Sequence, residues 1–327
     1  MYWNLSCPLE MSLFSASHMG GSFLRRANEG RQLVLDEMVL ERIQFPKNRR
    51  IWFVGDSLMR QVYISMACLL WNHVESHSVA WFDKRGSRTQ QPHSINQGPH
   101  SKFEQARVRL RQGGDTSELL FHHGAGGLLK LGKDFTVDKS DSWLEACFLD
   151  QPLFAKALWI HRHMKGERVV QEHNATTERV RLGARDVVVM NGSIHAERSI
   201  NLQTIGNLID CLKAKQNGKR NVRFPSFVYM HTGAVDHFPT SNGEFDPSFL
   251  EQDEPGLCRQ EATRRDMFVE ESLVLGGKVP LVGQEVVELQ FHAGNLHVGG
   301  KDCLHWVQPG IPDLLAVNVS TFVASLV

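Results

Sequence analysis

Several features that would assign this chain to a common class are missing from its sequence. The 327 residues carry 36 basic and 36 acidic side chains, and no basic block stands out, which argues against nucleic acid as a main partner. The longest nearly apolar run, from about Val62 to Trp71, is half the length of a membrane span. The overall composition, 42% hydrophobic and 22% charged, is that of an ordinary globular protein with a sizeable core.

Motifs for metal and nucleotide chemistry are absent or incomplete. None of the six cysteines has C-x-x-C spacing, which argues against a zinc site built on cysteine. No H-E-x-x-H completes the neighbouring histidines at 122–123 and 161–163, so we expect no metal and no cofactor. Residues 127–133 imitate a phosphate loop, but Asp134 stands where a serine or threonine should ligate Mg²⁺.

The first residues, Met1 to Pro8, lack a basic segment followed by a continuous apolar segment. They are therefore not a signal peptide as written. From these residues alone we expect either a cytosolic protein or a sequence that starts late.

The most informative feature that is present is a serine between an apolar run and a helical pattern. The run from Ile51 to Val54 is rich in β-branched and aromatic residues and predicts a buried strand, and the apolar spacing from Leu58 to Trp71 predicts a helix. Ser57 would then lie at a helix N-terminus, where unpaired N–H groups and the positive dipole end favour developing negative charge. It is a candidate nucleophile, although serine is also a favoured helix cap. The lack of Gly-X-Ser-X-Gly argues against an α/β-hydrolase elbow.

A second pattern lies near the C-terminus. Asp302 and His305 are three residues apart, and in a turn or a first helical turn this spacing can place both side chains on one side of the backbone. A carboxylate beside an imidazole fixes its tautomer and stabilises the imidazolium during proton transfer. The prolines and glycine at 309–312 indicate a rigid loop. The alternative is a surface aspartate and a half-buried histidine without chemistry.

Short apolar segments alternate with helical patterns along the rest of the chain. We expect further strands at 106–111, 119–123, 186–190, 227–231 and 285–290, and helices at 142–164, 200–215 and 311–326. The first of these strands is expected at a sheet edge, and the polar stretch 76–101 is expected to be a surface loop that helps wall a cleft. The alternation predicts an α/β fold whose parallel sheet is covered on both faces, as a single domain over 1–327 with an N-terminal extension at 1–48.

Two motifs together resemble a known family. Residues 55–61 (Gly-Asp-Ser-Leu-Met-Arg-Gln), taken with 302–313, are similar to the trichome birefringence-like / PC-esterase branch of the SGNH (GDSL) superfamily. A looser similarity covers 231–258. Val307 and Phe245 depart from the family pattern, which has a second cysteine and a tryptophan there. The resemblance implies a three-layer α/β/α, SGNH-like (flavodoxin-like) parallel sheet.

The resemblance also implies roles for individual residues. Ser57, His305 and Asp302 would form the catalytic triad. A further set would hold the oxyanion or the substrate: Asp56, Arg60, Gly124, Asn191 and His195. Competing explanations remain for these, because an asparagine before glycine is typical of turns, glycine-rich turns occur for backbone reasons, and an arginine can be structural.

The function implied by the resemblance is serine-dependent O-acyl transfer, with O-acetylation of polysaccharide or glycan hydroxyls as the first expectation and an acetyl donor as co-substrate. The alternatives are a carbohydrate acetylesterase with the same triad and a non-catalytic glycan-binding relative. The resemblance further implies residence in the secretory pathway, in the Golgi, and a disulfide between Cys258 and Cys303. Cys7 and Cys68 are a second expected pair, whereas Cys147 and Cys211 are expected to be buried thiols because they fall in helical patterns.

Overall fold

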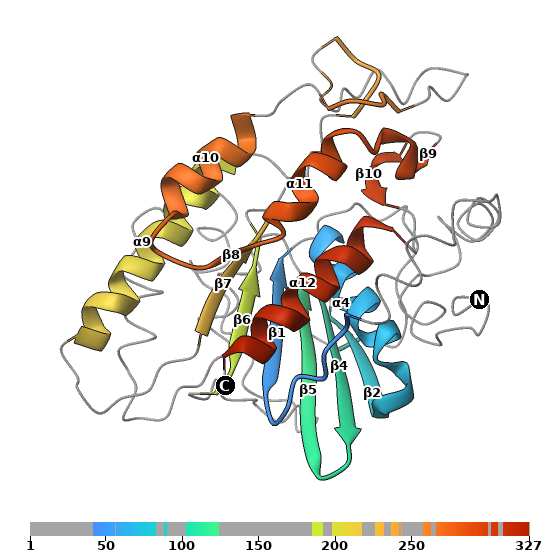
Figure 1. Ribbon diagram of the computed structural model, residues 1–327, viewed down its shortest axis with the longest axis vertical. Helices are drawn as coiled ribbons and strands as arrows, with labels where there is room; N and C mark the ends of the chain where they lie inside the picture. Colours follow the sequence, from blue (N-terminus) through green and yellow to red (C-terminus); the bar gives the residue numbers. More distant parts are fainter. Residues whose placement is uncertain are drawn as a thin grey trace.

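The structure of the protein is a computed structural model in which an eight-stranded sheet is flanked by helices (Figure 1). The described residues are 42–55, 57–82, 88–89, 103–123, 185–191, 198–217, 226–231, 237–241, 243, 258–262, 266–299, 302–306 and 310–326. The α/β prediction is confirmed, and the arrangement is consistent with the SGNH fold.

The sheet has a parallel half and an antiparallel half. Its strands in chain order are β1 (Arg50–Gly55), β2 (Val74–Phe82), β3 (Arg88–Thr89), β4 (Phe103–Gln112), β5 (Asp115–His123), β6 (Val187–Met190), β7 (Ser226–Met230) and β8 (Leu281–Val282). The spatial order is β3-β2-β4-β5-β1-β6-β7-β8. Strands β5, β1, β6, β7 and β8 pair in parallel, and β3, β2, β4 and β5 pair antiparallel. The sheet is therefore mixed, where the sequence predicted a parallel one.

Helices cover both faces of the sheet. They are α4 (Ser57–Leu69), α9 (Arg198–Asn217), α10 (Asp266–Leu275), α11 (Gln284–Phe291) and α12 (Ile311–Ser325), with 3-10 turns at Trp71–His73 and Gly294–Leu296. Alternate side chains of a strand point to opposite faces. Phe53 and Val189 accordingly pack against α4 and α12, whereas Val54 and Val188 pack against α9. Figure 1 shows these helices on either side of the sheet.

A buried aspartate sets the register of the two central strands. Asp186, which is 3% exposed, precedes β6. Its carboxylate accepts hydrogen bonds from Arg50 Nε at 2.9 Å and from the indole Nε1 of Trp52 at 3.1 Å. Both donors lie on β1. The two strands pair from Ile51 with Val187 to Val54 with Met190, so their carboxyl ends lie next to each other.

Two expectations about the antiparallel half are wrong. Residues 76–82 of the expected surface loop belong to β2, and residues 88–89 form β3. The strand expected at an edge, β4, lies between β2 and β5. Glu75, Ser76 and His77 are exposed although they lie in β2, because pairing with β4 satisfies the backbone without requiring apolar side chains.

The late strand expected at 285–290 is a helix, α11. Val286 and Gln290 are both buried, and their spacing of four residues is helical. Gly283 precedes the helix with φ 86°, and a Cβ there would lie 2.7 Å from Cδ2 of Leu315. The short strand that does occur here is β8, immediately before this glycine.

Cysteine chemistry also differs from the expectation. Cys211 is disulfide-bonded, so the expected buried thiol at this position is wrong. Cys68 is disulfide-bonded as well, and the described part of the chain contains no free cysteine. The helix expected at 142–164, Cys147 within it, and most of the N-terminal extension lie outside the described residues.

Candidate active site

Ser57 occupies the junction that the sequence predicted. It is the first residue of α4, and β1 ends at Gly55, so a single residue separates strand from helix. The strand is buried from Ile51 to Gly55. The serine therefore lies at the carboxyl end of a central parallel strand, the edge where α/β sheets bind ligands.

Asn191 lies directly beside this junction. Strands β1 and β6 pair Val54 with Met190, so Gly55 and Asn191 are the next residues along. A Cβ added to Gly55 would lie 2.0 Å from Asn191 Oδ1 and 2.9 Å from its Cγ. The asparagine side chain, 3% exposed, thus covers the Cα of the residue two positions before Ser57. The structure thus places this predicted site residue beside the strand end that precedes Ser57.

His305 lies on a strand, where a turn or helical turn was expected. It belongs to β10 (Asp302–Trp306), which pairs antiparallel with β9 (His297–Gly299) in a separate two-stranded sheet. In a regular strand, residues 302 and 305 would face opposite sides. The register, however, shifts between Asp302 and Trp306, so the regular alternation is interrupted. The burial pattern agrees, because Cys303 and Trp306 are buried while Leu304 and His305 are partly exposed.

A glutamine side chain joins α4 to this strand. Gln61 Nε2 donates a hydrogen bond of 2.7 Å to the carbonyl oxygen of Trp306. The N–H of Trp306 donates one of 3.1 Å to Gln61 Oε1. Gln61 is 1% exposed and lies one helical turn after Ser57. The residue that follows His305 is therefore attached to the first turns of the helix that begins at Ser57.

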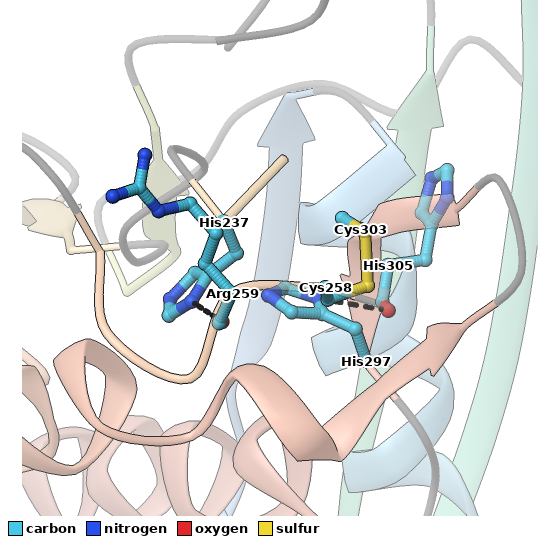
Figure 2. Close-up of a disulfide and its surroundings, with 6 residues drawn as sticks. All are labelled: His237, Cys258, Arg259, His297, Cys303 and His305. Atoms are coloured by element: carbon cyan, nitrogen blue, oxygen red, sulfur yellow. Dashed lines mark hydrogen bonds between the residues drawn. A yellow bond between two sulfur atoms is a disulfide. The ribbon is translucent and has the colours of Figure 1, made fainter. Parts of the chain in front are cut away.

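Aromatic and imidazole rings pack on the other side of β10. His297 stacks on Trp306 with ring centroids 3.9 Å apart and an interplanar angle of 19°. Its Nδ1 donates to the carbonyl oxygen of His305 at 3.1 Å. The His305 ring points away from this cluster, as Figure 2 shows. The backbone of His305 thus contacts the His297 cluster, whereas its imidazole does not point into it.

His237 completes the cluster and has a perturbed pKa. Its ring lies 4.8 Å from that of His297. Nδ1 faces the carbonyl oxygen of Arg259 at 2.9 Å, and Nε2 faces that of Gln290 at 3.0 Å. Burial lowers the pKa of His237, and the two carbonyl partners oppose this effect. A neutral imidazole has one N–H, so it donates to one of these carbonyls at a time.

The predicted disulfide is confirmed. Cys258 and Cys303 are bonded and their Cα atoms are 5.4 Å apart. Phe238 and Leu304 pack with the bridge. The disulfide ties the segment around Arg259 to β10, two residues before His305 (Figure 2).

His231, a further polar strand end, has a different role. Tyr229 packs with the α9 side of the sheet and Met230 with the α4 side, so His231 returns to the α9 side. Its Nδ1 bonds the carboxylate of Glu271 on α10, which also accepts a 2.7 Å hydrogen bond from the Tyr229 hydroxyl. This buried group fastens α10 to β7, on the opposite face from Asn191.

The remaining predicted site residues divide into two groups. Arg60 is partly exposed on α4, one turn from Ser57. Asp56, Gly124 and His195 lie outside the described residues. Within the described ranges, no group of three or more histidine, cysteine, aspartate or glutamate side chains is placed to hold a metal ion. Sequence reasoning assigned no role to Gln61, although the residue stands inside the quoted motif.

One protein-family model matches part of this chain. Residues 39–184 match the model of PC-Esterase, described as a GDSL/SGNH-like acyl-esterase family found in Pmr5 and Cas1p. This match identifies a PC-esterase domain over residues 39–184. A family of acyl-esterases implies an enzyme. The matched residues include Ser57, whereas Asn191 and His305 lie beyond them. No curated protein matches the chain, and no helix among the described residues is both long and apolar enough to cross a membrane.

Proposed function

We propose that this protein is a serine-dependent O-acyltransferase in which Ser57 is the nucleophile and His305 the general base. The observation that carries the proposal is the pair of hydrogen bonds between Gln61 on α4 and Trp306 on β10. Gln61 lies one turn after Ser57, and Trp306 is the residue after His305. Residues separated by most of the chain are thereby held on neighbouring elements. Asp302, at the start of the same strand, would orient the imidazole.

The proposed reaction has two steps. His305 takes the proton of the Ser57 hydroxyl while the oxygen attacks an acyl carbonyl, and the protonated imidazole then gives that proton to the leaving group. In the second step a sugar hydroxyl loses its proton to His305 and attacks the acyl-enzyme, and the protonated imidazole returns that proton to the departing Ser57 oxygen. Water in place of the sugar hydroxyl would give hydrolysis by the same triad.

The oxyanion of each tetrahedral intermediate needs preorganised donors. We assign this role to the Ser57 N–H and the Asn191 side chain, with Arg60 and a Gly124 amide as further donors and Asp56 and His195 beside the substrate. The close contact of Asn191 with Gly55 supports the assignment, because it fixes the amide beside the junction. Removing one such donor typically lowers kcat about 10²–10³-fold.

The proposed acyl group is acetyl, the acceptor a polysaccharide or glycan hydroxyl, and the compartment the Golgi. The disulfides support a secretory location, because such bonds persist in oxidising compartments. The single-domain organisation over 1–327 belongs to the same proposal.

The test compares transfer with hydrolysis. The purified protein is incubated with an aryl acetate in the presence and absence of neutral oligosaccharides, and acetylated sugar and free acetate are quantified by mass spectrometry. The proposal predicts that acetylated sugar forms with the wild type and is lost in Ser57→Ala. Free acetate alone, insensitive to added sugar, would make the protein an esterase. Equal turnover by Ser57→Ala would overturn the serine mechanism, and binding of the sugar without turnover by the wild type would indicate a non-catalytic relative.

A further inference from the structure

We propose that Gln61 is a positioning residue that sets the location of His305 relative to Ser57. This inference rests on the proposed function and assigns a task to a side chain that neither contacts the acyl group in that mechanism nor exchanges a proton. Its basis is the pair of hydrogen bonds between Gln61 and the backbone of Trp306.

The contact has the form of a strand pairing. The primary amide of Gln61 donates to the carbonyl of Trp306 and accepts from its N–H, so it engages both backbone groups of one residue, as the peptide of a neighbouring strand would. The two complementary bonds determine which amide atom is oxygen and which is nitrogen. A side chain without both a donor and an acceptor cannot make this pair of bonds.

The backbone around His305 is held at three successive points. The Cys303 sulfur is bonded to Cys258, the His305 carbonyl accepts from His297, and Trp306 is bonded to Gln61. The first two attachments lead to the segment around Arg259 and to β9. The attachment through Gln61 leads instead to α4, the helix that begins at the proposed nucleophile.

This link connects the proposed nucleophile to the proposed base through α4. Gln61 lies four residues after Ser57, about one turn further along α4. The His305 side chain is partly exposed and extends away from the His297 cluster. The backbone next to His305 is bonded to Gln61, so a shift of this backbone would move the imidazole relative to α4. A displacement of about 1 Å between reacting groups can cost about 10²-fold in rate.

The experiment is a double-mutant cycle between Gln61→Met and His305→Ala, read by the rate at which a fluorophosphonate probe labels the folded full-length chain. Methionine keeps the length and volume of the side chain without either hydrogen bond. In the wild-type background, Gln61→Met should lower the maximal labelling rate about 10²-fold and leave the half-saturating probe concentration within about threefold. In the His305→Ala background it should have almost no further effect, because a residue that acts through His305 has nothing left to position.

Two additional variants separate positioning from folding. Val319→Ala removes two methyl groups from a 1% exposed side chain on α12, and it should lower the melting temperature without changing the labelling rate. Each variant is first checked for folding by its melting temperature. Gln61→Glu keeps the size of the side chain and the acceptor for the Trp306 N–H. Its labelling rate should fall by about tenfold, again with no further loss in the His305→Ala background.

The outcomes distinguish the inference from the function beneath it. If His305→Ala labels as fast as the wild type, the proposed function fails. The positioning role fails, and the function stands, in two cases in which His305→Ala itself labels slowly. In the first, the Gln61 variants label at the wild-type rate. In the second, a Gln61 substitution lowers the labelling rate of the His305→Ala protein by the same factor as that of the wild type. A matching loss in Val319→Ala would attribute the effect to stability and would also overturn the inference.

Discussion

Replacing Gly55 by alanine perturbs the proposed oxyanion site through one methyl group. The new Cβ would lie 2.0 Å from Asn191 Oδ1 and 2.9 Å from the Cβ of Met59. Both distances are too short for non-bonded atoms, so a neighbouring group has to shift. Met59 is on α4 and fully buried, so it has little room to move. We therefore expect the Asn191 side chain to move, since rotation of its amide relieves the shortest contact.

The magnitudes follow from overpacking and from the loss of a donor. Extra methyl groups in a well-packed core cost about 1–3 kcal/mol, so the folded state should survive. A displaced oxyanion donor lowers kcat by about 10²–10³-fold, which corresponds to about 3–4 kcal/mol of barrier. Gly55→Ala should thus lose far more activity than stability.

The assay combines aryl acetate turnover with urea unfolding for four proteins: wild type, Gly55→Ala, Asn191→Ala and the double variant. The double variant should regain part of the stability, because the Asn191 contact is removed, but none of the activity. Gly114→Ala is the matched control, because a Cβ there meets nothing within 4 Å; it should match the wild type in both measurements. Wild-type turnover by a folded Gly55→Ala protein would refute the placement of Asn191 in the oxyanion site.

Two further predictions concern the cluster beside β10. Burial lowers the pKa of His237 below its ordinary value of 6.5. The unfolded chain therefore binds more protons below that pH, and the free energy of unfolding should fall on acidification. His237→Gln should reduce this pH dependence in urea titrations at pH 7.5 and 5.5, and an unchanged dependence would exclude His237 as its source. Replacing both Cys258 and Cys303 by serine should lower the free energy of unfolding by about 4 kcal/mol, the loop-closure value for a sequence separation of 45. A loss below about 1 kcal/mol in denaturant titration would show that the bridge constrains the unfolded chain little.

The junction at Ser57 could be predicted because its signals are local. The apolar run of β1 and the helical spacing of α4 lie within about twenty consecutive residues, and both elements form where those patterns indicated. Helix α12 and strand β6 were predictable for the same reason. The apolar spacing of α4 and α12 matched a helix, and the short runs of β-branched and aromatic residues in β1 and β6 favoured buried strands.

Predictions failed where tertiary contacts outweigh local pattern. The polar residues of β2 form a strand because β4 supplies backbone partners, and the short 285–290 segment is helical although its period is ambiguous. The 302–305 segment became an interrupted strand through pairing with β9.

The site itself shows the same limit. The sequence singled out Ser57 and Asn191 as candidates from local patterns. Gln61 instead bonds a residue 245 positions away, and a glutamine inside a helical pattern gives no indication of such a partner. The resemblance to a family supplied the Cys258–Cys303 pair, which spacing alone leaves open.

The most direct test of the central claim locates the covalent adduct. The wild-type protein is labelled with a fluorophosphonate probe, digested, and mapped by peptide mass spectrometry, with Ser57→Ala and His305→Ala treated in parallel. The account predicts one adduct, on Ser57, that is absent in Ser57→Ala and forms about 10²–10⁴-fold more slowly in His305→Ala, as expected for loss of a general base. An adduct on another residue, or labelling of Ser57 at an unchanged rate without the His305 imidazole, would contradict it.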